Sequence, residues 1–171
     1  MLRQAGSTSD RTDHQDGGKM ADRRQVAISF DSSDGLCFGC GQNNPIGLKL
    51  DFKWDSGTAR AEFTPDRFYQ GWPGVVHGGI IATMLDEAMG QAIRFSGLNC
   101  VTAQMQVDYK QPILTGDNLV ITGSISKNNR RLVEAEAKVS LPDSTVMAEG
   151  SAIFVNMEHP DISKGKKQEN D

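Results

Sequence analysis

Apolar and polar residues alternate with the two-residue period of a β-strand over several stretches of this chain. Two such stretches come early, at 47–52 and 58–64, and the turn-forming sequence Asp-Ser-Gly lies between them. We predict that they form a β-hairpin. Four later stretches are rich in Val, Ile and Thr and are separated by turn-like sequences; they cover 100–110, 118–126, 131–140 and 145–156. Short, local connections of this kind favour an antiparallel sheet.

Between the two groups of strands, residues 78–95 have the spacing of a long helix. Apolar side chains recur there every three or four positions, at Ile81, Met84, Leu85, Ala88, Ala92 and Phe95. This spacing places them on one side of an α-helix, and Gly97 provides a stop because glycine readily adopts the left-handed conformation that ends many helices. Residues 65–76 contain Pro, Gly and aromatic residues without a period, which is typical of a loop. One apolar helix on one face of an antiparallel sheet makes the predicted fold class α+β.

The two ends of the chain differ in composition from the region that carries these patterns. Residues 1–25 are rich in Asp, Arg, Ser, Gln and Gly, with few large apolar side chains. Such a segment buries too little apolar surface to offset the entropy lost on ordering. In a chain of 171 residues we therefore predict a disordered tail over 1–25, one domain over 26–158 and a flexible tail over 159–171.

Composition and charge exclude several classes of function. No apolar run approaches the roughly 18 residues that a membrane span requires. The net charge is −4 and the Lys and Arg residues are scattered, so we expect no nucleic-acid partner. The three cysteines are an odd number and follow nothing that resembles a secretory signal, which favours a reducing, cytoplasmic location.

The helical stretch carries a carboxylate where the pattern predicts burial. Asp86 lies among Ile, Ala, Met and Leu residues, and an ionised carboxylate without a partner is costly in such surroundings. Small residues share its side of the helix, namely Gly79, Ala82, Thr83 and Gly90. This strip leaves room for a ligand or another subunit, although a structural pair is the alternative interpretation of Asp86. Glu87 lies about 100° further around the helix, where it can reach solvent or pair with Arg94.

The sequence Val75-Val76-His77-Gly78-Gly79 leads directly into this helix. The first amides of a helix have no intrahelical partner, and glycine lets another group approach the backbone closely. The Gly78 or Gly79 amide, at the positive end of the helix dipole, is thus a candidate donor to a developing oxyanion. The alternative is a glycine turn that only starts the helix, with His77 satisfied by the backbone.

Cys37 and Cys40 have the two-residue spacing of metal-binding thiols. A zinc site needs further ligands; Cys100 is a possible third, and no histidine has ligand-like spacing to it. We therefore expect no metal and no other cofactor.

The segment VVHGGIIATMLDEAMG resembles the signature of PaaI-like hotdog thioesterases, in which His-Gly-Gly opens the central helix and an acid follows nine positions after the His. The resemblance extends from about Leu36 to Phe154 and includes Tyr109 and Pro112. It implies the hotdog fold, a curved antiparallel sheet wrapped around one long central helix. It also implies a homodimer or a dimer of dimers, with each active site at a subunit interface, and hydrolysis of an acyl-CoA substrate.

The same resemblance implies a role for each matching residue. The Gly78 amide polarises the thioester carbonyl, His77 is a neighbouring positioning residue, and Asp86 is the nucleophile or the base that activates water. Thr102 matches a Ser or Thr position that in some relatives orients water from the partner subunit. For substrate contact the candidates are Gly79, Gln70, Trp72 and Met105, of which Gln70 matches an Asn or Gln that several relatives carry ahead of His-Gly-Gly.

Two other functions stay open. A non-catalytic hotdog module that binds acyl-CoA or lipid would keep the pocket but would not need Asp86. A hotdog dehydratase or hydratase is less favoured, because those relatives place Asp and His together in a different helix-entry motif.

Overall fold

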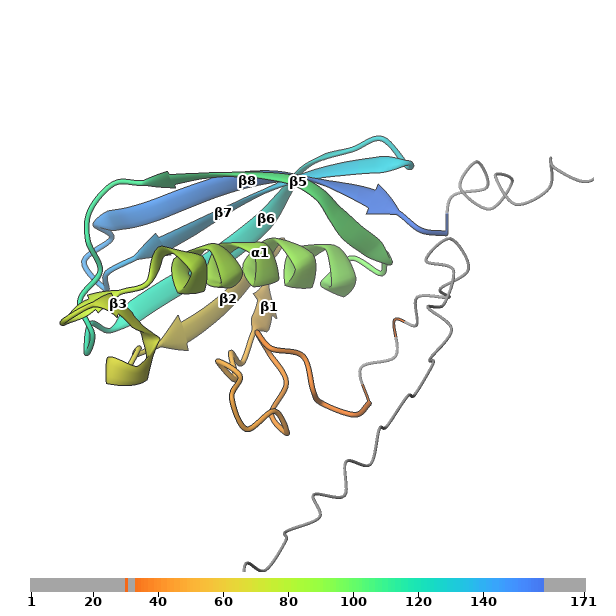
Figure 1. Ribbon diagram of the computed structural model, residues 1–171. Helices are drawn as coiled ribbons and strands as arrows, with labels where there is room; N and C mark the ends of the chain where they lie inside the picture. Colours follow the sequence, from red (N-terminus) through yellow and green to blue (C-terminus); the bar gives the residue numbers. More distant parts are fainter. Residues whose placement is uncertain (1–29, 31–32, 159–171) are drawn as a thin grey trace, which may run out of the picture.

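The computed structural model describes residue 30 and residues 33–158. The predicted tails at 1–25 and 159–171 lie outside the described residues. A six-stranded antiparallel sheet curves over one long helix, α1 (Gly78–Phe95), as Figure 1 shows. The strands are β1 (Lys53–Asp55), β2 (Thr58–Phe63), β5 (Cys100–Tyr109), β6 (Leu119–Asn128), β7 (Leu132–Ser140) and β8 (Val146–Asn156). Their order across the sheet is β1-β2-β6-β7-β8-β5, so the predicted α+β class is confirmed.

The four later strands and the helix form where the sequence predicts them, within a few residues at each end. The early hairpin is shifted. Its turn has Ser56 at φ 48° and Gly57 at φ 91°, and this pair of positive angles defines the tight type I′ turn that suits the twist of two antiparallel strands.

The predicted strand at 47–52 is wrong, because the first strand begins only at Lys53. Lys49 has a φ of 56°, a left-handed conformation that interrupts an extended chain. The Leu48 and Leu50 amides instead donate to the carbonyls of Phe38 and Gly39, at 2.8 and 2.9 Å. Both leucines are buried, so the alternation of apolar residues reflects burial correctly but not the backbone conformation.

The predicted loop at 65–76 is wrong in part. It contains a 3-10 turn at Arg67–Tyr69 and a small antiparallel pair, β3 (Gln70–Trp72) with β4 (Val75–Val76). The tight connection uses Gly74 at φ 78°, which glycine adopts without steric cost. These strands have only three and two residues, too few for a periodic pattern to predict them.

The C-terminal end of α1 is closed by a glycine, as predicted. Gly97 has a φ of 78° and donates to the carbonyl of Arg94 at 2.9 Å, while Leu98 donates to Ile93 at 3.3 Å. This pair of bonds is the Schellman motif, which satisfies the last carbonyls of a helix. Among the described residues, no helix combines the length and hydropathy needed to cross a membrane.

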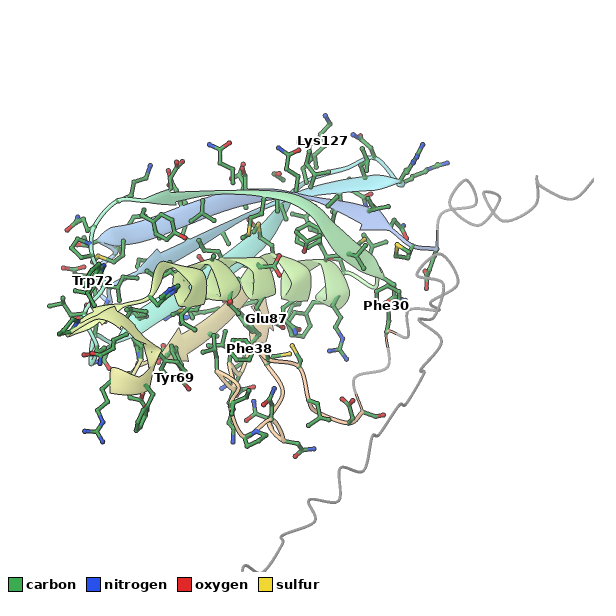
Figure 2. The ribbon with its side chains drawn as sticks, in the orientation of Figure 1. Phe30, Phe38, Tyr69, Trp72, Glu87 and Lys127 are labelled. Carbon is green, nitrogen blue, oxygen red and sulfur yellow. The ribbon has the colours of Figure 1, made fainter. Side chains whose placement is uncertain are left out.

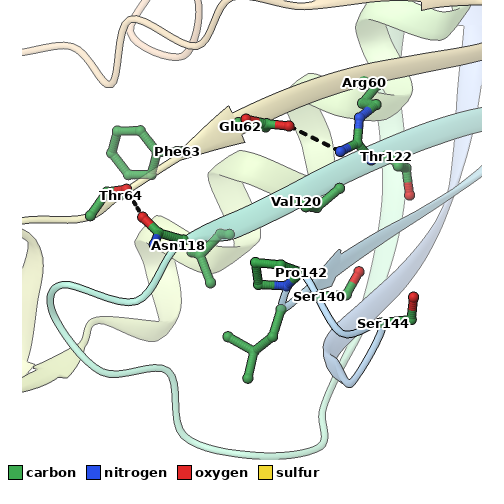
Figure 3. Close-up of a pocket in the computed structure, with 12 residues that line it drawn as sticks. Arg60, Glu62, Phe63, Thr64, Asn118, Val120, Thr122, Ser140, Pro142 and Ser144 are labelled. Atoms are coloured by element: carbon green, nitrogen blue, oxygen red, sulfur yellow. Dashed lines mark hydrogen bonds and ion pairs between the residues drawn. The ribbon is translucent and has the colours of Figure 1, made fainter.

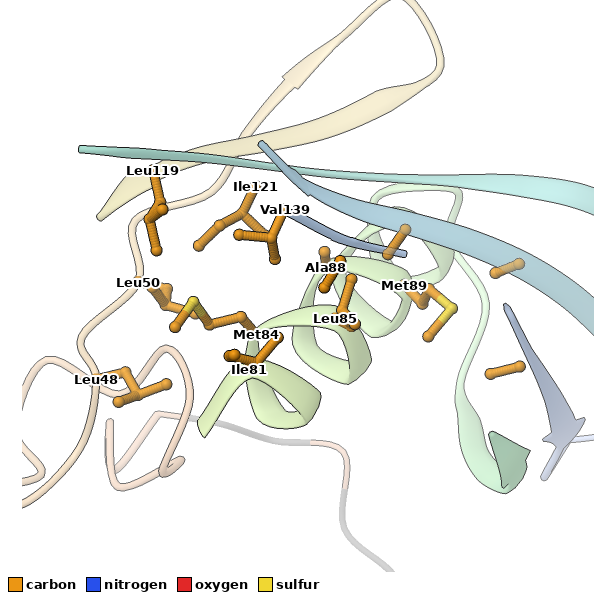
Figure 4. Packing of buried hydrophobic residues seen from close by; sticks show 14 of the residues in the cluster. Leu48, Leu50, Ile81, Met84, Leu85, Ala88, Met89, Leu119, Ile121 and Val139 are labelled. Atoms are coloured by element: carbon orange, nitrogen blue, oxygen red, sulfur yellow. The ribbon is translucent and has the colours of Figure 1, made fainter. Parts of the chain in front are cut away.

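The core lies between α1 and the face of the sheet that curves over it (Figure 4). Five of the six predicted helix residues are buried, whereas Phe95 is 42% exposed and stacks on Trp54. Alternate residues of the strands face the helix, as a two-residue period requires.

A row of small residues runs across four strands beneath the helix. Ala59 of β2 pairs with Gly123 of β6, Gly123 with Ala137 of β7, and Ala137 with Gly150 of β8. A methyl group built on Gly123 would overlap the carbonyl group of Ala88 and lie 2.9 Å from the amide nitrogen of Met89. The helix can therefore approach the sheet closely along this row, because its residues have small side chains or none.

We predict that Gly123→Ala destabilises the protein by about 1 to 3 kcal/mol, because the added methyl group forces helix and sheet apart. Urea unfolding followed by circular dichroism measures the change. Ser124→Ala is the matched control, since the neighbouring residue of β6 lies on the other face, and its effect should stay within about 0.5 kcal/mol. Equal stability of the two variants would contradict the close contact.

Candidate functional site

The N-terminal end of α1 is capped by His77. Its backbone is extended, with φ −64° and ψ 134°, and its Nδ1 accepts a hydrogen bond from the Gly79 amide at 2.8 Å. The His77 amide in turn donates to the carbonyl of Tyr69 at 2.8 Å. Gly71 lies against the imidazole, because a methyl group there would be 3.1 Å from Cδ2 of His77. The ring is thus held as a cap, which agrees with the structural interpretation of this residue.

This cap leaves Gly78 as the amide available for another acceptor. As the first residue of α1, Gly78 has no helical carbonyl to which it can donate, and the described residues supply no other acceptor. The Gly79 amide is already used by His77. The sequence allowed either glycine as a donor, and the geometry favours Gly78.

Tyr109, to which the sequence gave no role, holds this end of the helix. Its hydroxyl donates to the Gly78 carbonyl at 3.0 Å. A methyl group at Gly78 would meet the tyrosine ring at 3.5 Å, which is an ordinary contact distance. Tyr109 ends β5, so the edge strand and the helix start are joined directly.

Asp86 lies half-buried on the side of α1 that faces β5. The hydroxyl of Thr102 donates to its Oδ1 at 2.8 Å. The pairing of β5 with β8 shifts register between Thr102 and Gln104. Bulges of this kind change the direction in which side chains of a strand point. Thr102 thus contacts Asp86 within one chain. Among the described residues, the Thr102 hydroxyl is the hydrogen-bond donor to the Asp86 carboxylate, and it uses Oδ1 and not Oδ2. Gly79 and the small residues predicted on the same side of the helix are exposed or half-buried.

The candidate substrate contacts lie in different settings. Oε1 of Gln70 accepts from the Gly74 amide at 3.0 Å, so this side chain supports the β3–β4 turn. Trp72 is 78% exposed and lies at the end of the molecule where α1 begins (Figure 2). Met105 of β5 is half-buried and packs against the edge of the core.

A groove of about 680 Å³ lies elsewhere, on the outer side of β2 and β6 (Figure 3). Arg60, Glu62 and Thr122 line it, and these residues alternate with the buried ones of the same strands. None of the predicted site residues lines this groove. It is therefore distinct from the helix-borne site.

The Cys-Phe-Gly-Cys turn packs against Glu87, about 100° around the helix from Asp86 (Figure 2). Sγ of Cys37 is 3.4 Å from Oε2 of Glu87, whereas the sequence placed Glu87 toward solvent or Arg94. Burial, together with the nearby Glu87 carboxylate, raises the pKa of the Cys40 thiol. All three cysteines are free thiols. Because Glu87 and this turn are far apart in the sequence, no local pattern could have predicted their contact.

Comparison with known proteins shows which family the middle part of this chain resembles. Residues 73–148 match the protein-family model described as thioesterase superfamily. Acyl-coenzyme A thioesterase THEM4 from Xenopus laevis is 34% identical over 96 residues, which are 56% of this chain and 43% of that protein. This segment is therefore similar to the thioesterase superfamily.

Solved structures agree on the fold. One crystal structure of a thioesterase superfamily protein has a TM-score of 0.69 at 27% identity and covers 77% of this chain and 68% of its own. The PaaI protein of E. coli has a TM-score of 0.60 at 20% identity, with 64% of this chain and 84% of that chain covered. The predicted PaaI-like hotdog fold is confirmed. The matched region spans less than half the length of the Xenopus relative.

Proposed function

We propose that this chain hydrolyses acyl-CoA thioesters, with Asp86 as the catalytic carboxylate and the Gly78 amide as the donor to the carbonyl oxygen. The observation that carries the proposal is the Thr102–Asp86 hydrogen bond of 2.8 Å on the half-buried side of α1. It holds one carboxylate oxygen and leaves the other available for chemistry. The thioesterase superfamily match and the name of the Xenopus relative support the same reaction class.

The chemistry needs few groups. Water adds its oxygen to the thioester carbonyl carbon, the carbon–sulfur bond breaks, and the departing CoA thiolate takes up the proton that the water loses. Asp86 either removes that proton or attacks the carbon itself to form an anhydride that water then opens. The carbonyl oxygen gains negative charge in both routes, and one amide donor at a helix N-terminus contributes about 3 kcal/mol to stabilising such a charge.

The spacing of the two groups along α1 favours a second subunit as the source of one of them. Asp86 is eight residues beyond Gly78, which is about 12 Å at 1.5 Å per residue. A donor about 3 Å from the carbonyl oxygen and an attacking atom about 3.5 Å from the carbon lie at most about 8 Å apart. The short Asp86 side chain makes up only part of the difference. For direct attack by Asp86, one thioester therefore contacts both groups more readily if they come from two chains.

The edge of the sheet offers a place for that second chain. β5 has ten residues and ends the strand order, so its outer edge pairs with no described strand. A long unpaired edge readily pairs with another strand. We infer a homodimer in which two β5 strands pair about a two-fold axis and the two helices run antiparallel. This arrangement moves Gly78 of one chain toward Asp86 of the other.

The outer face of the sheet, which points away from α1, is polar and does not need to be buried by another subunit. It carries charged residues, including the Lys127–Glu134 pair at 3.4 Å and the Lys110–Glu149 pair at 2.8 Å. Lys127 points away from the helix in Figure 2. A dimer is therefore sufficient to complete the proposed site, and a dimer of dimers would need polar contacts.

We expect Asp86→Asn to lower thiol release from acyl-CoA by at least about 1,000-fold, because the amide can neither attack nor accept the proton of water. A panel of aliphatic and aromatic acyl-CoAs, assayed with a thiol reagent, measures this loss and identifies the acyl class.

Asp51→Asn is the control, since Asp51 is exposed and outside the helix, and it should keep the parent activity. Acyl-CoA binding by calorimetry should persist in Asp86→Asn. Binding without turnover in the parent protein would favour the non-catalytic module instead.

Thr102 is proposed as a positioning residue for Asp86. Thr102→Val removes the hydroxyl but keeps the shape, so kcat should fall about 10- to 100-fold while KM changes little. Thr102→Ser keeps the donor and should recover most of kcat. Steady-state kinetics on one acyl-CoA separates the two parameters; a serine variant as slow as the valine variant would show that the hydrogen bond does not matter.

The two-chain site can be tested by mixing two inactive variants. Gly78→Pro removes the donor amide, and it suits this position because proline is favoured at the first helical residue and the extended His77 tolerates a following proline. A mixed dimer of Gly78→Pro and Asp86→Asn, isolated through two affinity tags, contains one complete site. It should show about half of the parent activity.

Gly78→Ala is the control for this experiment, because it keeps the amide and its methyl group meets Tyr109 only at ordinary contact distance. A silent mixed dimer, with both variants folded, would mean that the two groups act within one chain. An active Gly78→Pro homodimer would mean that Gly78 is not the donor.

A further inference from the structure

A second cluster of reactive side chains surrounds Glu87, about 100° around α1 from Asp86. The Sγ atoms of Cys37 and Cys40 and a carboxylate oxygen of Glu87 all lie within 4.8 Å of one another. The Cys37 thiol donates to Oε2 of Glu87 at 3.4 Å. The proposed hydrolysis uses none of these three groups.

The turn that carries the two cysteines is built for this approach. A methyl group on Gly39 would overlap the Glu87 carboxylate, with the carboxyl carbon at 2.8 Å. The Gly41 amide donates to the Cys37 carbonyl at 2.9 Å, which closes the turn. Glycine at 39 therefore lets both thiols face one carboxylate.

Gln91 supports the cluster from the next turn of the helix. Its Nε2 donates to Oε1 of Glu87 at 2.8 Å and lies 3.2 Å from Sγ of Cys40. By hydrogen-bonding both the carboxylate and the sulfur, Gln91 orients the two groups, as residues around metal ligands commonly do.

The separations suit a tetrahedral zinc ion. Zn–S bonds of about 2.3 Å and Zn–O bonds of about 2.1 Å place tetrahedral ligand atoms roughly 3.6 to 3.8 Å apart. The three ligand atoms are within 4.8 Å of one another. Side-chain rotations that move these atoms by about 1 Å would bring them to the separations of a zinc site. Two thiolates with a carboxylate are a ligand set that zinc accepts, and thiolates disfavour magnesium and calcium.

A fourth ligand position opens onto a cavity of about 320 Å³, lined by Gly90, Arg94 and Asn99 among others. Two thiolates and a carboxylate carry three negative charges against the two positive charges of zinc. The Arg94 guanidinium at the same cavity can offset the remaining charge. Water or a small anion can fill the open position.

We propose that Cys37, Cys40 and Glu87 form a zinc-binding site that links the cysteine turn at residues 37–40 to α1. Binding releases the two thiol protons to solvent and forms two Zn–S bonds and one Zn–O bond. The proposal is independent of the acyl-CoA hydrolysis above.

The first test uses the unaltered full-length chain, purified with a phosphine reductant and freed of metal. Zinc is added at one equivalent, the protein is alkylated briefly, and peptide mass spectrometry reads each cysteine. Zinc should protect Cys37 and Cys40 from alkylation at least tenfold and leave Cys100, which lines the same cavity, unchanged. Equal alkylation of all three cysteines with and without zinc would overturn the proposal.

Cobalt(II) supplies a second readout, because thiolate ligands give it an intense charge-transfer absorption. The parent and Cys100→Ser should bind one cobalt ion per chain with this absorption, whereas Cys37→Ser and Cys40→Ser should lose it and Glu87→Gln should bind at least tenfold more weakly. Circular dichroism of each metal-free variant confirms folding. A Cys40→Ser variant that binds cobalt like the parent, or a parent that binds none, would refute the site.

Discussion

The closeness of α1 to the sheet determines where every side chain of the candidate site lies. Gly123 faces the carbonyl group of Ala88 without a side chain between them, and alanine or glycine occupies the paired positions on β2, β7 and β8. Larger residues in this row would lift the helix and change its rotation. Because the helix rests on this row of small residues, its rotation about its own axis is set by backbone contact.

That rotation separates two neighbouring carboxylates by about 100° and gives them different surroundings. Asp86 meets Thr102 on the edge strand β5, while Glu87 meets the cysteine turn of the N-terminal segment. The helix thus serves two sites at once, one for the proposed hydrolysis and one for the proposed metal. A small change in helix rotation would disturb both, although they share no residue.

Local patterns in the sequence were enough for the later strands, the helix and its glycine stop, because each depends on neighbours a few positions away. The candidate residues His77, Gly78, Asp86 and Thr102 came from a motif and its resemblance to a family. The failures share another cause. The left-handed Lys49, the row of small residues and the contact of Glu87 with Cys37 depend on segments distant in sequence, and no periodicity in one segment reveals what will be packed against it.

The short connection between α1 and β5 has a consequence for how such chains can diverge. The Schellman turn at Gly97 ends the helix and β5 begins at Cys100, so very few residues separate the end of the helix from Thr102. Successive residues of a strand point to opposite faces. A one-residue shift of β5, caused by an insertion in this connection, would turn Thr102 away from Asp86 and would also turn Met105 away from the edge of the core. Relatives that keep the active site should therefore keep the length of this connection more strictly than its amino-acid sequence.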